Sequence, residues 1–197
     1  MRADVSEHET LHPMRFVFAG LGIALTGCEV LFPLEPPGDG PSVDSTKESC
    51  PADYLLGFDT SFYRFQTVPA NWTDAEKICE GDTTTKITHL ASPETLSEHR
   101  FLRANLSIHG IDEPAWLGVA RESSAVGTLR TSFLRLDGER QLLGWQDFQP
   151  DNSTAEEYAA IIDPNQDLVD IAYQASHMFV CECDGKARTV TFDFEMF

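Results

Sequence analysis

The sequence predicts an α+β domain, and three observations carry this prediction. Residues 61–66 (SFYRFQ) alternate aromatic and polar side chains, which is typical of a half-buried strand. Two segments with helical periodicity follow, at 71–79 and 93–106. Short apolar segments separated by long irregular connections fill the rest of the chain. Strands and helices that are grouped, rather than regularly alternating, indicate the α+β class.

The two predicted helices each have a recognisable start and an apolar side. Residues 71–79 (NWTDAEKIC) offer Asn71 or Thr73 as the capping residue. The second helix, 93–106, has Ser92 at the cap and Pro93 at the first helical position. The apolar side of the first helix comprises Trp72, Ala75, Ile78 and Cys79, and that of the second comprises Leu96, Phe101 and Leu102.

The later part of the chain predicts short strands. Residues 115–119 (AWLGV) form a compact apolar segment, and 158–162 and 177–183 are two further candidates. Residues 130–147 contain strand-like pieces on either side of Asp137-Gly138, a sequence typical of hairpin turns. After these strands, the alternating run Thr189-Val-Thr-Phe-Asp-Phe predicts an additional edge strand.

Residues 14–28 have the three parts of a secretory signal peptide. Arg15 supplies a positive charge, 16–25 form a short apolar run, and Leu25-Thr-Gly-Cys28 places small residues before a cysteine. The apolar run is too short to span a bilayer permanently, so a cleaved signal is predicted. The last four residues resemble the lipobox of bacterial lipoproteins, which implies a diacylated Cys28. A buried helix that happens to end at Gly-Cys is the alternative.

The signal peptide with its lipobox, 1–28, sets the first predicted domain boundary, and cleavage before Cys28 leaves that residue as the new N terminus. Within it, residues 1–13 are polar and acidic, unlike the start of a signal peptide, and initiation at Met14 would exclude them. Residues 29–49 are rich in Pro, Gly and Ser and predict a flexible tether. A globular domain is expected over 50–183, followed by a C-terminal extension, 184–197.

Charge and cysteine content narrow the class of protein. The formal net charge of −18 argues against a nucleic-acid partner, because a polyanion would be repelled. Five cysteines occur, and assigning Cys28 to the lipid leaves an even set. That set predicts two disulfides with three possible connectivities. A zinc site is the less favoured alternative, because metal ligands usually come as close pairs at both ends. The remaining cysteines are Cys50, Cys79, Cys181 and Cys183.

Six short motifs, taken in order, resemble the pattern of a C-type lectin-like domain. They are Phe62-Tyr63-Arg64-Phe65, Trp72-Thr73-Asp74-Ala75 with Cys79, Leu90-Ala91-Ser92, Trp116-Leu117-Gly118-Val119, Trp145 ahead of Gln149-Pro150-Asp151-Asn152, and Phe179-Val180-Cys181-Glu182. Each motif is weak alone, but the ordered set covers 50–183 and includes all three tryptophans. The resemblance implies two helices, short antiparallel sheets and a long irregular loop region.

The resemblance also implies a disulfide framework. By the family pattern, Cys79 pairs with Cys181. The family's usual partner for the first cysteine is missing, since that position holds Phe62, and we infer that Cys50 pairs with the additional Cys183. Bridges that close such long loops stabilise a fold by about 3–5 kcal/mol in the chain-entropy model.

Two departures from the family pattern concern the long loop region. The family's second disulfide would need cysteines at Tyr158 and Tyr173, so an aromatic contact between these tyrosines is expected in its place. The pattern's tryptophan and its asparagine ligand are replaced by Leu168 and Val169, and Val169 brings no oxygen. The second departure weakens the case for a complete metal shell.

By the same resemblance, the long loop region is implied to bind calcium and sugar. Calcium takes six to eight oxygen ligands. The candidate metal ligands are Gln149, Asp151, Glu156 and Asp170, with Asn152 and Glu157 as nearby substitutes. The implied sugar-binding residues are Gln149, Asp151, Asn152, Glu156 and Asp170. The Gln-Pro-Asp motif implies galactose-type hydroxyl geometry, while an ordinary polar turn is the alternative interpretation of 149–152.

No catalytic motif is found, so no enzymatic activity and no catalytic residue is predicted. The six histidines lack metal-binding spacing, and neither a Gly-x-Ser-x-Gly elbow nor a P-loop occurs. We predict an exported module, lipid-anchored at Cys28 and placed at the outer membrane or cell surface by Glu29, that recognises carbohydrate through Gln149 to Asp170. A protein-interaction or structural module of the same fold, without sugar or calcium, is the alternative.

Overall fold

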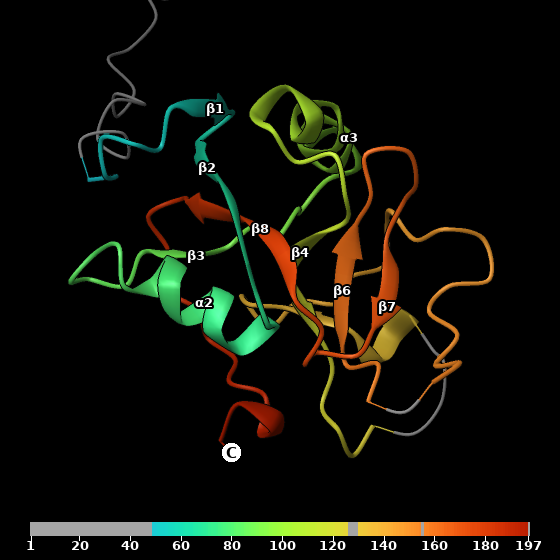
Figure 1. The fold of residues 1–197 in the computed structure, drawn as a ribbon. Helices are drawn as coiled ribbons and strands as arrows, with labels where there is room; N and C mark the ends of the chain where they lie inside the picture. Colours follow the sequence, from blue (N-terminus) through green and yellow to red (C-terminus); the bar gives the residue numbers. More distant parts are fainter. Residues whose placement is uncertain (1–48, 126–129, 155, 197) are drawn as a thin grey trace, which may run out of the picture. The chain divides into compact units, whose positions relative to one another are not determined.

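The computed structural model describes residues 49–125, 130–154 and 156–196. The predicted signal peptide, Cys28 and the predicted tether up to residue 48 lie outside these residues. Within them, a mixed sheet and two α-helices form one α+β unit, which confirms the predicted class (Figure 1). No helix of the described residues has the length and apolar character needed to cross a membrane.

The described elements are two α-helices, three 3₁₀ helices and eight strands. The α-helices are α2 (Trp72–Glu80) and α3 (Leu96–Leu106), and the 3₁₀ helices are η1 (Ser107–His109), η2 (Arg130–Ser132) and η3 (Asp193–Met196). The strands are β1 (Leu56–Phe58), β2 (Ser61–Ala70), β3 (Thr88–Leu90), β4 (Ala115–Ala120), β5 (Leu134–Arg135), β6 (Ala159–Ile162), β7 (Val169–Ile171) and β8 (His177–Cys183).

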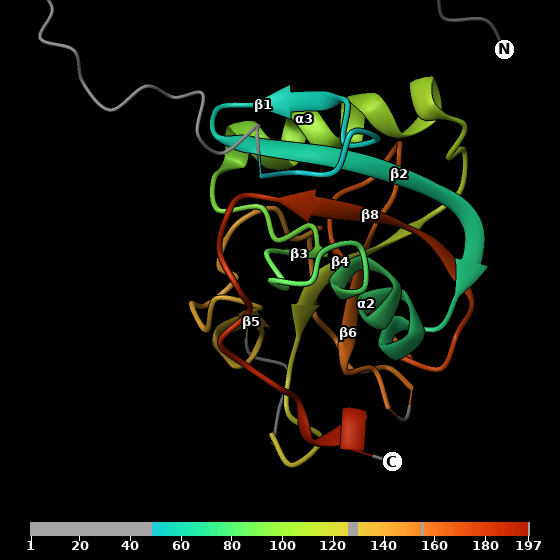
Figure 2. The ribbon, with the colours of Figure 1, turned by 90° about the vertical axis from the view of Figure 1, so that its left-hand side faces the viewer.

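Strand β8 lies inside the sheet and pairs with β2, β3 and β4. The strand order is β1-β2-β8-β4-β6-β7, with β3 paired to β8 and β5 paired to β4. Strands β4 and β8 run parallel, and the other pairs are antiparallel. Helix α2 packs against β3 and β8, on the side that faces the viewer in Figure 2. The chain between β5 and β7 forms long connections, and these carry the candidate site.

Two disulfides fasten β8 to the N-terminal half of the domain. Cys79 at the end of α2 is bonded to Cys181, and Cys50 is bonded to Cys183. Both pairings agree with the prediction. Because all four cysteines are used, the zinc alternative is excluded for them.

Helix α2 begins as predicted, and three of its four predicted apolar residues are buried: Trp72, Ala75 and Cys79. Asn71 is the cap, since its side-chain oxygen accepts a hydrogen bond from Asp74 N (2.9 Å). Ile78, expected on the apolar side, is 46% exposed. Glu76 is fully buried instead, because its carboxylate accepts a hydrogen bond from Leu90 N (2.7 Å) on β3. The hydrogen bond from Leu90 N to Glu76 thus places a carboxylate, and not Ile78, on the buried side of the helix.

Helix α3 begins later than predicted. Its cap is Thr95, whose hydroxyl accepts a hydrogen bond from Glu98 N (3.1 Å). Ser92, the predicted cap, is buried against β4, where its hydroxyl donates to Gly118 O (2.9 Å). Pro93 therefore lies in the connection that precedes the helix.

The C-terminal extension does not form the predicted edge strand. Thr189 N and Val190 N both donate to the single carbonyl of Leu136 (2.8 and 3.3 Å), so no strand ladder forms. The next donors bond to carboxylates: Phe192 N donates to Glu195 (2.8 Å) and Asp193 N donates to Glu122 (3.0 Å). The chain consequently turns into the 3₁₀ helix η3, and Phe192 and Phe194 are buried.

A group of buried ionisable side chains lies beside α2 and β8. Burial raises the pKa of Glu76 to about 7, although Arg188 and His89 oppose the shift. Burial also raises the pKa of Glu182, which accepts a hydrogen bond from Ser92 N (2.9 Å). For His89, burial lowers the pKa, but the neighbouring carboxylates outweigh it and raise the value to about 9. All three groups therefore hold their protons more tightly in the folded state.

We expect the domain to lose stability as the pH rises from 7 to 9. A group whose folded-state pKa is raised contributes stability while it is protonated, and this contribution is lost as the pH rises through the folded-state value. Most of the loss between pH 7 and 9 comes from His89, whose folded-state pKa is about 9, because Glu76, with a folded-state pKa of about 7, loses most of its contribution between about pH 5 and 7. The expected loss is about 2–3 kcal/mol in the free energy of unfolding.

Urea denaturation at each pH measures this loss. The Glu76→Gln variant should show a flatter pH dependence between pH 6 and 8, because one of the titrating groups is gone. A free energy of unfolding that increases from pH 7 to 9 would contradict the prediction.

Candidate functional site

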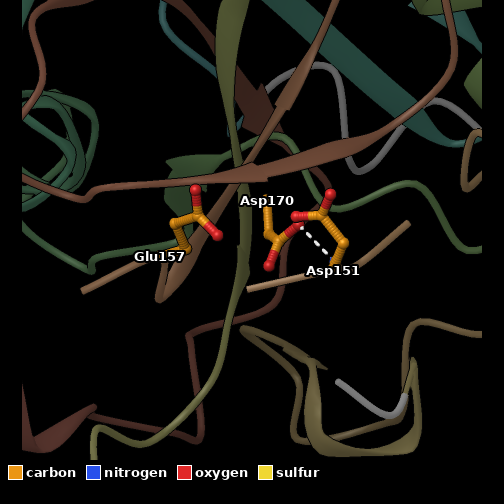
Figure 3. Close-up of side chains that lie close together, drawn as sticks. All are labelled: Asp151, Glu157 and Asp170. Carbon is orange, nitrogen blue, oxygen red and sulfur yellow. Dashed lines mark hydrogen bonds between the residues drawn. The ribbon is translucent and has the colours of Figure 1, made fainter. Parts of the chain in front are cut away.

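Three carboxylates meet in the long loop region. Asp151 lies in the loop after Pro150, Glu157 lies just before β6, and Asp170 lies on β7. One oxygen from each lies within 4.8 Å of the others. In Figure 3, Asp170 lies between Asp151 and Glu157. We call these three residues the acidic cluster.

Asp170 connects the loop to the sheet. It is 3% exposed, and its two carboxylate oxygens accept hydrogen bonds from Asp151 N and Asn152 N, both at 3.0 Å. Its own backbone N–H donates to Gln149 Oε1 (3.4 Å). Burial raises the pKa of Asp170, and the nearby charge of Glu157 adds to the shift, while the two amide hydrogen bonds oppose it.

Glu157 has a buried oxygen that lacks a hydrogen-bond partner. The residue is 5% exposed, and its Oε1 accepts from Thr154 Oγ1 (2.7 Å) and Ser153 Oγ (3.3 Å). Its Oε2 is buried and receives no hydrogen bond from the described residues. A buried, unpaired carboxylate oxygen is costly, and a bound ion or water is the usual explanation. The Glu157 carboxylate is also one of the three groups that converge with Asp151 and Asp170.

Glu156, a predicted ligand, does not lie in the acidic cluster. Its carboxylate accepts a hydrogen bond from the side-chain amide of Gln174, and the residue is exposed. Glu156 has a positive φ of 67°, so the chain turns at this residue. Glu157, two residues before Ala159 on β6, is directed inward instead. Glu157 therefore occupies the place in the acidic cluster that the resemblance assigned to Glu156.

Gln149 and Asn152 lie beside the acidic cluster, with their side-chain oxygens already bonded. Gln149 Oε1 accepts from Asp170 N, and Asn152 Oδ1 accepts from Arg121 Nη2 (2.5 Å). The Gln149–Pro150 peptide bond is cis. Val169 is half-buried against the core, so it supplies a packing surface and no oxygen.

Arg121 is a part of the site that sequence reasoning missed. It directly follows β4 and is 2% exposed. Besides Asn152, its guanidinium donates to the carbonyl oxygen of Glu157 (3.3 Å), and it lies over the rings of Phe133 and Tyr158, with centroid distances of 5.6 and 5.5 Å. A buried cation thus supports the loop next to the carboxylates. An arginine directly after an apolar strand was the available signal.

An exposed aromatic ring precedes the cluster in the same loop. Phe148 is 93% exposed, and its φ of 66° is unusual for a bulky residue. Arg130 supports this turn, because its guanidinium donates to Gln149 O (2.8 Å) and Gln146 O (3.1 Å). A strained conformation that exposes an apolar ring is a feature that often accompanies a binding site.

The donor set fits a hard divalent cation. Carboxylate oxygens are the ligands that calcium prefers, and three of them converge here. Further positions of a six- to eight-ligand shell would remain for water or for hydroxyl groups of a ligand. The arrangement therefore suits a cation that also contacts a bound molecule.

Comparisons with known proteins identify the fold. No protein-family model matches the chain, and no curated protein matches it. The structure is similar to the C-type lectin CEL-I from Cucumaria echinata, with 21% identity and a TM-score of 0.57, over 68% of this chain and 96% of that one. It is also similar to the mouse scavenger receptor C-type lectin carbohydrate-recognition domain, with 24% identity and a TM-score of 0.54, over 72% and 99%.

A third similar structure is a Ca²⁺-dependent type II antifreeze protein in its Ca²⁺-free form. It shares 22% identity with a TM-score of 0.52, over 68% of this chain and 98% of that one. At these levels of identity the similarity establishes the fold. The chain has the C-type lectin-like fold, as the ordered motifs predicted.

Proposed function

We propose that this chain is a carbohydrate-binding module whose ligand site is built on a calcium ion. Asp151, Glu157 and Asp170 would hold the ion. The convergence of three carboxylates within 4.8 Å carries this proposal, and the buried Oε2 of Glu157 supports it, because a buried carboxylate oxygen without a hydrogen bond is normally satisfied by an ion or water. A bound calcium ion would offer open coordination positions to two neighbouring hydroxyl groups of a sugar.

The residues around the acidic cluster supply the other requirements of sugar recognition. Gln149 uses its side-chain oxygen for Asp170 N, which leaves its amide N–H groups to donate to hydroxyl oxygens. Phe148 offers an exposed ring to the apolar face of a sugar. Similarity to a domain named for carbohydrate recognition supports this reading through the fold alone.

The proposal includes export and lipid attachment at Cys28. It is supported by the signal-like order of residues 14–28 and by two disulfides, which form in oxidising compartments. The domain over 50–183 would then be displayed on the tether 29–49, outside the cytoplasm. Non-enzymatic binding is proposed, since the acidic cluster is explained by a cation and its ligand.

A second candidate is a protein-interaction module of the same fold. It is favoured by Val169, which offers no oxygen, and by the side-chain oxygens of Asn152 and Glu156, which bond to Arg121 and Gln174. In this case the acidic cluster would stay empty and the loops would contact a protein.

We expect calcium to stabilise the domain. Calcium at about 100 times its dissociation constant should raise the free energy of unfolding by about 2.7 kcal/mol, because only the folded chain assembles the acidic cluster. Thermal melting with calcium and with EGTA measures the effect. Glu157→Gln should abolish it, whereas Asp147→Asn, an exposed residue of the same loop, should leave it intact. Melting curves unaffected by calcium and by EGTA would support the protein-interaction module.

We expect galactose-type sugars to bind in calcium and to be released by EGTA. A glycan array followed by calorimetry with galactose and mannose tests this expectation. Phe148→Ala should weaken sugar binding about 3- to 10-fold, the effect of losing one aromatic contact of about 0.5–1.5 kcal/mol, while calcium binding is retained. A folded, calcium-loaded sample that binds no glycan would contradict carbohydrate recognition.

Lipid attachment is tested by fractionating cells of a Gram-negative bacterium that expresses the full chain. We expect the protein in the membrane fraction, extracted by detergent and not by high salt. Cys28→Ser should release it into the soluble extracytoplasmic fraction, because the acylated side chain is removed. Recovery of both proteins in the same fraction would contradict the anchor.

A further inference from the structure

The C-terminal extension reaches the candidate site from outside the sheet. After β8 ends at Cys183, the chain runs past β5 to η3, which lies near α2 and β6 (Figure 2). Its hydrogen bonds to the β5 region are made by Thr189 N and Val190 N, which donate to Leu136 O (2.8 and 3.3 Å). Two features of η3 then contact segments that carry site residues.

The first feature is the ring of Phe194. This residue is 4% exposed, and its ring centroid lies 4.5 Å from that of Tyr173 and 6.0 Å from that of Tyr158. The two tyrosine rings are stacked on each other at 5.9 Å. Tyr158 directly follows Glu157, and Tyr173 follows β7, which carries Asp170. Phe194 therefore packs beside the start of β6 and the end of β7, next to the segments that carry Glu157 and Asp170.

The second feature is the carboxylate of Asp193. It accepts hydrogen bonds from Ser123 N (2.8 Å) and from the Ser123 hydroxyl, while Asp193 N donates to Glu122 (3.0 Å). Glu122 and Ser123 directly follow Arg121, whose guanidinium holds Asn152 and the carbonyl of Glu157. A third segment of the site is thus fixed by the extension.

The conformation of η3 is itself fixed by a bidentate ion pair. Arg188 donates from Nη1 to Glu195 Oε2 (2.9 Å) and from Nη2 to Glu195 Oε1 (2.6 Å). Both side chains are about nine-tenths buried, at 11% and 10% exposed. Arg188 also bonds to Glu76 on α2 (3.4 Å), which ties the extension to the body of the domain.

We infer that the C-terminal extension is a clasp that sets the affinity of the acidic cluster for its cation. It contacts the chain at three places: at Glu122 and Ser123 after β4, at Tyr158 before β6, and at Tyr173 after β7. Loops that are ordered before binding do not lose conformational entropy at binding, so affinity depends on the clasp. The inference rests on the proposed function, because the cation is the ligand whose affinity is set.

Calorimetry with calcium chloride tests the clasp on three variants of the full domain. Asp193→Ala removes the bond to Ser123 and Phe194→Leu removes the contact with the tyrosines. Phe192→Leu is the matched control. The Phe192 ring packs on Trp72 (5.7 Å) and on Phe194 (5.6 Å) in the same core, and no ring contact joins it to either tyrosine in the described residues.

We expect Asp193→Ala and Phe194→Leu each to raise the calcium dissociation constant about 3- to 10-fold. Phe192→Leu should lower the melting temperature as much as Phe194→Leu does but change the dissociation constant less than about twofold. Equal changes in calcium affinity for the two phenylalanine variants, or none in either, would overturn the clasp.

A second readout separates failure of the clasp from failure of the proposed function. If the unmodified domain binds no calcium, the calcium site is wrong, and hydrogen exchange then tests the clasp alone. The amides of Asp151 and Asn152, which bond to Asp170, should exchange about 3- to 10-fold faster in Phe194→Leu and unchanged in Phe192→Leu. Equal exchange in both variants would overturn the clasp.

Discussion

The carboxylate of Asp170 is the contact on which the whole loop region depends. A long connection buries backbone N–H groups that no strand pairs, and each needs an acceptor. Asp170 accepts from Asp151 N with one oxygen and from Asn152 N with the other, and its own N–H donates to Gln149. Three points of the loop are thereby fixed to β7 by one residue. The same carboxylate retains lone pairs for a cation, so the anchor of the loop is also part of the site.

The interior contains several buried carboxylates, which differ in whether their oxygens have hydrogen-bond or ion-pair partners. Glu76 bonds to Leu90 N and Arg188, and Glu182 bonds to Ser92 N. These groups have partners, as buried charges in stable folds normally do. Within the described residues, Glu157 Oε2 is the buried carboxylate oxygen that has no hydrogen-bond partner. Glu76 and Glu182 are buried in the same domain and have partners, so the missing partner of Glu157 Oε2 is particular to the candidate site.

The sequence predicted the fold better than it predicted the side chains of the site. Aromatic and cysteine positions define the fold because apolar burial and bridges depend on residue type and order. Whether Glu156 or Glu157 points inward depends on a backbone turn with positive φ, which neighbouring glutamates do not reveal. Arg121 was missed for a similar reason: its partners include two carbonyl oxygens, an amide oxygen and two rings, which come together only in the fold.

The incomplete shell and Arg121 together bear on the strength of the proposed calcium site. Arg121 holds Asn152 in place without a metal, which lowers the cost of ordering the loop, but its charge opposes a second cation nearby. With three carboxylates and no side-chain oxygen from Val169, part of the proposed shell is left to other oxygens, such as water or ligand hydroxyl groups. Such a shell would be expected to bind calcium as weakly as extracellular calcium modules do, with a dissociation constant of about 10⁻⁴–10⁻³ M. A site of that strength fills where free calcium is millimolar, a condition that the proposed export would meet and the cytosol would not.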